Sequence, residues 1–524
     1  MKIGKKNMLM TWAITAVLSL AVLGMVALSL VVLGAANPSA AEEISEYTVD
    51  SFKAALSDLT DEAQVIAVCK EYVHEAEDLD LVRMVQSHWF ELDPESARAF
   101  FRSERKKNPE SARAVYLLGR IADTPLDKIE FGRRVIAIDS QNPYGYRLVL
   151  ATYVNELFAA QASEDDLALL ESELPQDEHL FAELMRLEPE VDYALEFMFD
   201  YLDYQGEYES ALIILEDARD LEASWAEDTV FSMIYAKLGR YADALKVIED
   251  QATSGVSDGY LAEDERAGYV QYFYERSLRK AKAYDEIIKF YKSQPDFSSN
   301  PQALYQVGCM FSLQAEPDQA FAYLDRAVAK GFVSVENVND DNDLMALHND
   351  PRWEDVVARI EANWEAGIEE RRQKVLASKF SRPAPPWILK DVQGNEVNLA
   401  DLRGHVLIFD FWATWCNPCR MAMPVLNTWQ RQEAPGGVRV YSINVWEPFP
   451  FKAKKFMADN EYAMNLLFGN DEVVQAYGIE GIPYICVVDA DGNIRYEEKG
   501  YEEGLGEKLN WWVEDLLAEV DSGS

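Results

Sequence analysis

The sequence predicts an all-α repeat domain followed by an α/β domain built on a central mixed sheet. Between residues 50 and 372, apolar residues recur at three- and four-residue spacing and strand-like alternation is absent. That pattern is typical of amphipathic helices. After a proline-rich stretch, residues 373–386, the pattern changes to short apolar runs separated by turns, and one run leads straight into a Cys-x-x-Cys motif. A chain of 524 residues is long enough for both domains.

The first 41 residues have the pattern of an export segment. Lysines precede a mostly apolar run, residues 8–33, and a cluster of small residues ends at Ala41. This arrangement fits a cleaved signal peptide, but the run is also long enough to span a bilayer. Both alternatives remain open. Each places the rest of the chain in the periplasm or cell envelope, because the lysines stay on the cytoplasmic side.

Residues 50–372 show weak internal repetition. The segment that begins at Gly206 recurs at Gly239, and the segment that begins at Tyr284 recurs at Pro317. This spacing resembles that of tetratricopeptide repeats, and the alternative is an irregular helical bundle. In both cases each helix pair has an apolar face that only its neighbours cover. The resemblance also implies a surface for a protein partner.

The proline-rich residues 373–386 are predicted to be a linker, and residues 387–520 a second domain. A short alternating strand is expected at 396–399 after a Gln-Gly-Asn turn. A continuous apolar run at 406–411 indicates a buried strand. The residues from 421 to 432 then have helical character.

The motif between that strand and that helix predicts thiol–disulfide chemistry. Cys416 would lie at the helix N-terminus, where backbone N–H groups and the helix dipole favour its thiolate. Cys419 would lie about one turn further and be more buried, and Pro418 is acceptable in a first turn. A zinc site would need two further ligands, and haem attachment would need His where Arg420 stands. A peroxidase would use a lone cysteine in a different loop.

The chain has five cysteines, too few for a disulfide scaffold of this length. Cys69, Cys309 and Cys486 stand in apolar surroundings, which favours small core residues over ligands. We therefore expect neither a metal nor a cofactor.

The C-terminal region resembles the thioredoxin superfamily, most of all its exported TlpA/ResA-like branch. The similarity runs from Ala384 to about Ala518 and includes the motif Phe-Trp-Ala-Thr-Trp-Cys-x-Pro-Cys, a proline in the next helix, and Gly-Ile-Pro before an apolar strand. The resemblance implies a thioredoxin-like fold in which Pro483 is a cis-proline facing the cysteines. Ile482 would then offer its backbone to a substrate, with Trp415 and Pro418 beside it. Tyr484 stands where a small hydroxyl residue is common, which leaves the substrate preference open.

Two acids are candidates for proton transfer. Asp410 lies on the buried strand six residues before Cys416, at the position of the buried acid of thioredoxin. Glu447 matches an active-site glutamate of the ResA-like branch. An acid in an apolar site has a raised pKa and can relay a proton. The alternatives are a satisfied core acid for Asp410 and a surface charge for Glu447.

The sequence thus predicts an exported thiol–disulfide oxidoreductase that acts on protein or peptide substrates. The resemblance favours reduction, with electrons from a membrane partner. The alternative is a repeat-based adaptor whose redox domain serves one dedicated partner. A net charge of −42 argues against nucleic acid or an anionic membrane surface as partner. Membrane contact is expected only through the N-terminal segment.

Overall fold

The computed structural model describes residues 47–523, apart from 57, 58, 60, 160, 189, 190, 433 and 448. The predicted export segment, residues 1–41, lies outside the described residues. In the described part of the chain, no helix combines the length and the apolar character needed to cross a membrane. The described residues form two compact units, one of Asp93–Ala281 and the other of Tyr47–Leu92 together with Lys282–Ser524.

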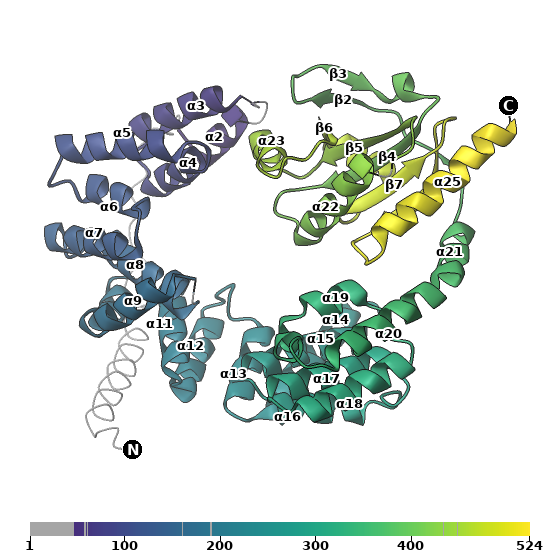
Figure 1. Ribbon diagram of the computed structural model, residues 1–524. Coiled ribbons are helices and arrows are strands. Elements are labelled where there is room, and N and C mark those ends of the chain that lie inside the picture. Colours follow the sequence, from purple (N-terminus) through teal and green to yellow (C-terminus); the bar gives the residue numbers. More distant parts are fainter. Residues whose placement is uncertain are drawn as a thin grey trace. The chain divides into compact units, whose positions relative to one another are not determined.

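The first unit is helical in all its regular elements, as predicted (Figure 1). Its elements are α5 (Pro94–Lys107), α6 (Ala112–Arg120), α7 (Pro125–Ile138), α8 (Pro143–Thr152), the π-helical turn η1 (Tyr153–Phe158), α9 (Glu164–Asp177), α10 (His179–Leu187), α11 (Asp192–Gln205), α12 (Tyr208–Asp220), α13 (Asp228–Lys237), α14 (Tyr241–Asp258) and α15 (Arg266–Lys280).

Several of these helices begin at side chains that cap them. Helix α7, for example, has the Thr124 hydroxyl accepting a hydrogen bond from the Asp127 N–H, with Pro125 in its first turn. Such a cap satisfies one of the N–H groups that have no partner within the helix. Helices α7 and α8 then approach closely, because a Cβ at Gly132 would lie 2.9 Å from the Gly145 carbonyl oxygen.

The 33-residue spacing seen in the sequence recurs in the backbone. Gly206 and Gly239 both have left-handed conformations, with φ of 76° and 71°, two residues before the helices α12 and α14. Lys282 and Ala315, which are also 33 residues apart, have φ of 52° and 57° two residues before α16 and α18. The same left-handed turn therefore joins the two helices within each of these pairs, α11 and α12, α13 and α14, α15 and α16, and α17 and α18.

The second unit contains helices that precede the first unit in the sequence and helices that follow it. They are α2 (Val49–Leu56), α3 (Glu62–Glu75), α4 (Leu79–Leu92), α16 (Tyr284–Ser293), α17 (Pro301–Leu313), α18 (Pro317–Ala329), α19 (Val335–Asp340), the 3-10 turn η2 (Asn342–Leu347), α20 (Trp353–Ala366) and α21 (Ile368–Ala377).

The remainder of this unit is an α/β domain with one eight-stranded mixed sheet among the described residues. Its helices are the 3-10 turn η3 (Leu399–Leu402), α22 (Asn417–Gln432), α23 (Pro450–Asp459), α24 (Asp471–Tyr477) and α25 (Leu505–Gly523). Its strands are β1 (Arg382–Pro383), β2 (Ile388–Asp391), β3 (Glu396–Asn398), β4 (Val406–Trp412), β5 (Val438–Asn444), β6 (Asn465–Phe468), β7 (Tyr484–Val488) and β8 (Asn493–Lys499).

The strand order is β1-β8-β7-β4-β5-β6-β2-β3. Strands β4, β5 and β6 are parallel, and β7 runs antiparallel to β4 on its other side. Strand β4 is therefore central, which explains why its side chains are buried from end to end. The predicted fold class, an all-α region followed by an α/β domain with a mixed sheet, is confirmed.

Two apolar clusters lie on opposite faces of this sheet. One includes Ile408 and Trp412 of β4 with residues of α22, α23 and α25, and the other includes Phe409 and Phe411 with residues of η3 and α24. The alternation along β4 thus assigns its even-numbered residues to the face that carries α22. This assignment decides which side chains can reach the two cysteines.

The segment expected as a linker, residues 373–386, contains regular structure. It begins within α21 and includes β1, which pairs with β8. The Lys379 ammonium group lies 2.6 Å from Glu519 of α25 and also contacts Asp515. Further back, the Trp364 indole N–H donates to Glu507 over 3.0 Å. Helices α20 and α21 are therefore attached to α25 by specific polar contacts.

Candidate active site

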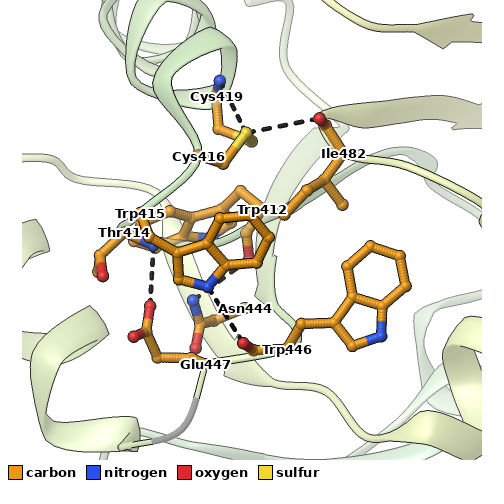
Figure 2. Close-up of a disulfide and its surroundings, with 9 residues drawn as sticks. All are labelled: Trp412, Thr414, Trp415, Cys416, Cys419, Asn444, Trp446, Glu447 and Ile482. Atoms are coloured by element: carbon orange, nitrogen blue, oxygen red, sulfur yellow. Dashed lines mark hydrogen bonds between the residues drawn. A yellow bond between two sulfur atoms is a disulfide. The ribbon is translucent and has the colours of Figure 1, made fainter. Parts of the chain in front are cut away.

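A disulfide between Cys416 and Cys419 lies where β4 gives way to α22 (Figure 2). The two Cα atoms are 5.3 Å apart. The exposed fraction is 4% for Cys416 and 0% for Cys419. Cys416 is thus the cysteine nearer to solvent, and a partner has to approach the pair from its side.

Cys416 directly precedes the first turn of α22. Its Sγ atom lies 3.2 Å from the Cys419 backbone nitrogen, whose N–H points to the sulfur. In the reduced state, this N–H and the positive end of the helix dipole would stabilise a Cys416 thiolate. The local structure therefore favours Cys416 as the nucleophile of the pair.

The loop before β7 also contacts the disulfide. The Ile482–Pro483 peptide bond is cis. The Ile482 carbonyl oxygen is 3.5 Å from Cys416 Sγ. Because β7 is antiparallel to β4, its first residues lie beside the last residues of β4, and this register brings the loop to the cysteines.

Two of the predicted substrate contacts are open to solvent. Trp415 is 59% exposed, and Pro418 is also exposed. The Trp415 indole N–H donates a hydrogen bond of 3.1 Å to the Trp446 carbonyl oxygen. The side chain next to the reactive cysteine is therefore held by the loop that follows β5 (Figure 2).

Glu447 lies on that same loop, three residues beyond β5. Its Oε2 atom accepts a hydrogen bond of 2.8 Å from the Thr414 backbone N–H. The carboxylate is half-buried and points to the segment just before Cys416. Glu447 is thus beside the redox motif, where it holds the backbone.

Asp410 is completely buried on β4. By the alternation of that strand it shares a face with Ile408 and Trp412, the face that also holds both cysteines. The pKa of its carboxyl is raised to about 7, because burial raises it more than the Ser442 hydroxyl on β5 lowers it. Neither carboxyl oxygen is within good hydrogen-bond geometry of a partner among the described residues, so Ser442 is near but offers little compensation. Burial without a compensating partner therefore favours the neutral acid.

The structure does not bring Tyr484 to the disulfide. Tyr484 is 2% exposed and belongs to the opposite apolar face, where it pairs with Phe411. Its hydroxyl donates to Glu497 over 2.8 Å and accepts from Arg382 over 3.2 Å. Tyr484, which follows Pro483, is therefore a core residue on the face of the sheet that does not carry the cysteines.

Two residues near the motif were missed by the sequence analysis. The Asn444 side-chain NH₂ donates to the Trp412 carbonyl oxygen over 3.2 Å, and the Val445 N–H donates to the same oxygen over 2.9 Å. Trp446 follows with a left-handed backbone, φ 54°, and a side chain that is 38% exposed. The position of Trp446 next to Glu447 was the one indication in the sequence that it lies near the site, because its left-handed backbone conformation is not visible there.

One grouping of possible metal ligands occurs among the described residues, and it is elsewhere. It consists of Cys309 of α17, Asp341, which directly precedes η2, and Asp343 of η2. Asp341 already accepts a hydrogen bond of 2.6 Å from the Tyr305 hydroxyl. The grouping includes neither Cys416 nor Cys419, so it has no part in the redox site.

Residues 380–497 match the model of the AhpC/TSA family. Among curated relatives, the thiol–disulfide oxidoreductase ResA of Geobacillus thermodenitrificans is 32% identical over 113 residues, which are 21% of this chain and 64% of that protein. ResA of Bacillus thuringiensis is 26% identical over 145 residues, 27% of this chain and 79% of that protein. A solved thioredoxin domain of a thiol–disulfide oxidoreductase from Bacteroides vulgatus is 27% identical and covers 26% of this chain and 94% of that one, with a TM-score of 0.23.

These similarities concern only the C-terminal domain. The chain spans 64% of the length of the Geobacillus relative. Together with the strand order and the position of the disulfide, the family match makes this domain thioredoxin-like, as the sequence predicted.

Proposed function

We propose that this protein is an extracytoplasmic thiol–disulfide oxidoreductase that reduces disulfides in protein or peptide substrates. The observation that supports this most is the Cys416–Cys419 disulfide at the start of α22, with the Ile482 carbonyl oxygen 3.5 Å from Cys416 Sγ. The relatives named ResA, which are called thiol–disulfide oxidoreductases, support the same reaction class.

The reaction starts from the reduced pair. The Cys416 thiolate attacks one sulfur of a substrate disulfide, and the other substrate sulfur leaves as a thiolate that takes up a proton. The Cys419 thiolate then attacks Cys416 Sγ in the mixed disulfide and releases the second substrate thiol. Two electrons pass to the substrate, and the chain is left with the Cys416–Cys419 disulfide.

The loop around Pro483 would orient the substrate. An extended segment that presents a sulfur to Cys416 would pass Ile482, whose backbone is available to it, with Trp415 and Pro418 on the other side. Because both of these side chains are exposed, they would form part of the contact surface. Such contacts fix the line of attack between sulfur atoms.

Asp410 is our candidate for proton transfer with Cys419. It shares the cysteines' face of the sheet, and its pKa of about 7 suits both release and uptake of a proton near neutral pH. Glu447 would act mainly through its hydrogen bond to the Thr414 N–H. We therefore assign Glu447 a positioning role in addition to any proton transfer.

The direction and the location rest on the sequence. An export segment at residues 1–41, whether retained through residues 8–33 or cleaved near Ala41, would place the domain outside the cytoplasm. Because each turnover oxidises the cysteine pair, a reductant has to restore it. A membrane protein that delivers two electrons is the partner class proposed for this step.

A second candidate function is that of an adaptor whose tetratricopeptide-like helices hold one dedicated partner. The attachment of α20 and α21 to α25 through Trp364–Glu507 and Lys379–Glu519 favours it, because the domain is not on a free tether. The two functions are separated by comparing the C-terminal domain alone with the whole chain. Equal rates on unrelated disulfide substrates would favour the general oxidoreductase.

The proposed function is tested by trapping. In Cys419→Ser the mixed disulfide at Cys416 is not resolved, so we expect disulfide-linked complexes to accumulate on non-reducing gels. Cys416→Ser is the matched control, since it keeps one thiol but removes the nucleophile that lies nearer to solvent, and it should trap at least about 10-fold less. Equal trapping by both variants would contradict the assigned order, and no trapping by either would contradict the function.

A further inference from the structure

The thioredoxin-like domain exposes few large apolar side chains, and two of them belong to the disulfide site. Among its described residues, the exposed ones are Ile388, Trp415, Met421 and Trp446. Trp415 adjoins Cys416, and Trp446 is joined to Trp415 by the indole N–H hydrogen bond of 3.1 Å. Exposed aromatic side chains at one place on a surface mark an interaction site.

The backbone of Trp446 is unusual for its residue type. Its φ of 54° lies in the left-handed region, which glycine adopts freely and bulky residues rarely adopt. The side chain remains 38% exposed, so burial does not account for its presence. Strained residues of this kind cluster at functional sites.

Contacts on both sides fix Trp446 in this conformation. Its carbonyl oxygen accepts the Trp415 indole N–H, and the next residue, Glu447, accepts the Thr414 N–H over 2.8 Å. Figure 2 shows the Trp446 indole on the opposite side of the loop from the Glu447 carboxylate. The backbone that carries this indole is therefore held next to Trp415, and the side chain is not part of the core.

We propose that Trp446 is a specificity-determining residue that selects substrates with a large apolar or aromatic side chain next to the cysteine under attack. This inference rests on the proposed function. A substrate sulfur that reaches Cys416 Sγ would bring its neighbouring residues near Trp415 and Trp446, because Trp415 adjoins Cys416 in the chain and its indole N–H is bonded to the Trp446 carbonyl oxygen. The Trp415 indole is held by a hydrogen bond to the Trp446 carbonyl oxygen, and the Trp446 indole is carried by that same backbone, so both offer apolar area with little loss of conformational entropy on binding. The occupant of this surface is thus the substrate segment itself.

The test uses the reduced full chain and three disulfide-linked peptides that differ only in the residue before cysteine, which is Leu, Ser or Lys. We expect the second-order rate constant to be about 10-fold higher for the Leu peptide than for the Ser peptide, the size of effect that one apolar side chain gives in a pocket. Trp446→Gly keeps the left-handed backbone without strain and removes the indole, so the ratio should fall to about 2-fold. Trp446→Phe should retain part of the preference.

Ile388→Thr provides the matched control, because Ile388 is 56% exposed on β2, away from β4 in the strand order. It should leave the Leu/Ser ratio unchanged. A Leu/Ser ratio unaffected by Trp446→Gly would overturn the inference. If Trp446→Gly lowered the rate constant of the Lys peptide alone, the inference would also fail, because Trp446 would then select a cationic side chain.

A binding measurement separates this inference from the proposed function. The oxidised chain is titrated with the same peptides carrying Ser in place of Cys, so that no disulfide exchange takes place. If the parent reduces no peptide but binds the Leu form at least about 5-fold more tightly in a Trp446-dependent manner, the proposed function fails and the apolar selectivity stands. Equal binding of all three peptides would overturn the selectivity whatever the activity.

Discussion

At the scale of single residues, Asp410 combines the greatest burial with the least compensation. It is completely buried, and both carboxyl oxygens are without a well-aligned partner among the described residues. A carboxylate in this position destabilises the folded state, because the charged form loses hydration that nothing replaces. The raised pKa of about 7 reflects this destabilisation, because the buried carboxyl group keeps its proton up to a higher pH.

We predict that Asp410→Asn stabilises the oxidised protein above pH 7 and changes little at pH 4. The carboxyl has its ordinary pKa, 3.8, in the unfolded chain and about 7 in the folded one, so the folded state binds more protons between these values. Stability of the parent therefore falls as pH rises from about 4 to about 7. The variant lacks this loss, so its advantage should grow over the same interval, to ~4 kcal/mol at most. Urea unfolding at several pH values measures the difference.

The same variant should be slower in catalysis. Removal of the acid should reduce disulfide reduction about 10- to 100-fold near neutral pH and flatten the pH–rate profile. Glu447→Gln is the control, because an amide oxygen can still accept the Thr414 N–H, and its effect should be smaller. A more stable variant with an unchanged profile would make Asp410 a structural residue without a role in proton transfer.

The site shows which residue properties a sequence reveals and which it hides. The order of strand, cysteine pair and helix located Cys416 and Cys419, since local periodicity and helix termini determine it. The face on which Tyr484 lies depends on its register with Phe411, which the sequence does not contain. The left-handed conformation of Trp446 likewise lies in a loop whose contacts are distant along the chain, from the Trp446 carbonyl oxygen to Trp415 and from Glu447 to Thr414.

At the scale of elements, the connection between helices and sheet determines how independent the redox domain is. Val375 and Leu376 of α21 pack against the apolar cluster that contains the cysteines. The Phe380 N–H donates to the Arg495 carbonyl oxygen over 3.1 Å, and the Arg495 side chain donates to the Phe380 carbonyl oxygen over 2.9 Å. The prolines between 383 and 386 suggested a linker, but composition alone does not show that β8 offers an edge for β1.

We predict that residues 381–524 fold alone with one cooperative unfolding transition, and that residues 368–524 are more stable by roughly 2 kcal/mol. The longer fragment restores two partly buried apolar side chains and the Phe380 hydrogen bonds, and these contacts together account for a difference of this size in the free energy of unfolding. Urea unfolding of both oxidised fragments measures the difference. Lys379→Met in the longer fragment shows how much of it comes from the contacts with Asp515 and Glu519. Equal stabilities would mean that α21 contributes nothing to the domain, and an insoluble shorter fragment would mean that it is indispensable.

At the scale of the whole molecule, the chain is strongly acidic and nearly three-quarters of it lies before the redox domain. A net charge of −42 keeps such a protein soluble and disfavours anionic partners. The helical region and the α/β domain were both predictable because their periodicities differ over long segments. The assignment of Tyr47–Leu92 to the same compact unit as Lys282–Ser524 was not predictable, since it depends on contacts between segments far apart in sequence.

We predict that everything after residue 41 is outside the cytoplasm. The lysines at positions 2, 5 and 6 would remain inside, while residues 8–33 enter the membrane. Protease added to intact spheroplasts should therefore degrade the C-terminal domain, with a cytoplasmic protein as the control for lysis. Replacing the three lysines by glutamate should reduce export, because the positive charges set the orientation of the apolar segment. A domain that resists protease until the cells are lysed would contradict export, and the cysteine pair would then have to work among cytoplasmic reductants, where a structural disulfide is rarely kept.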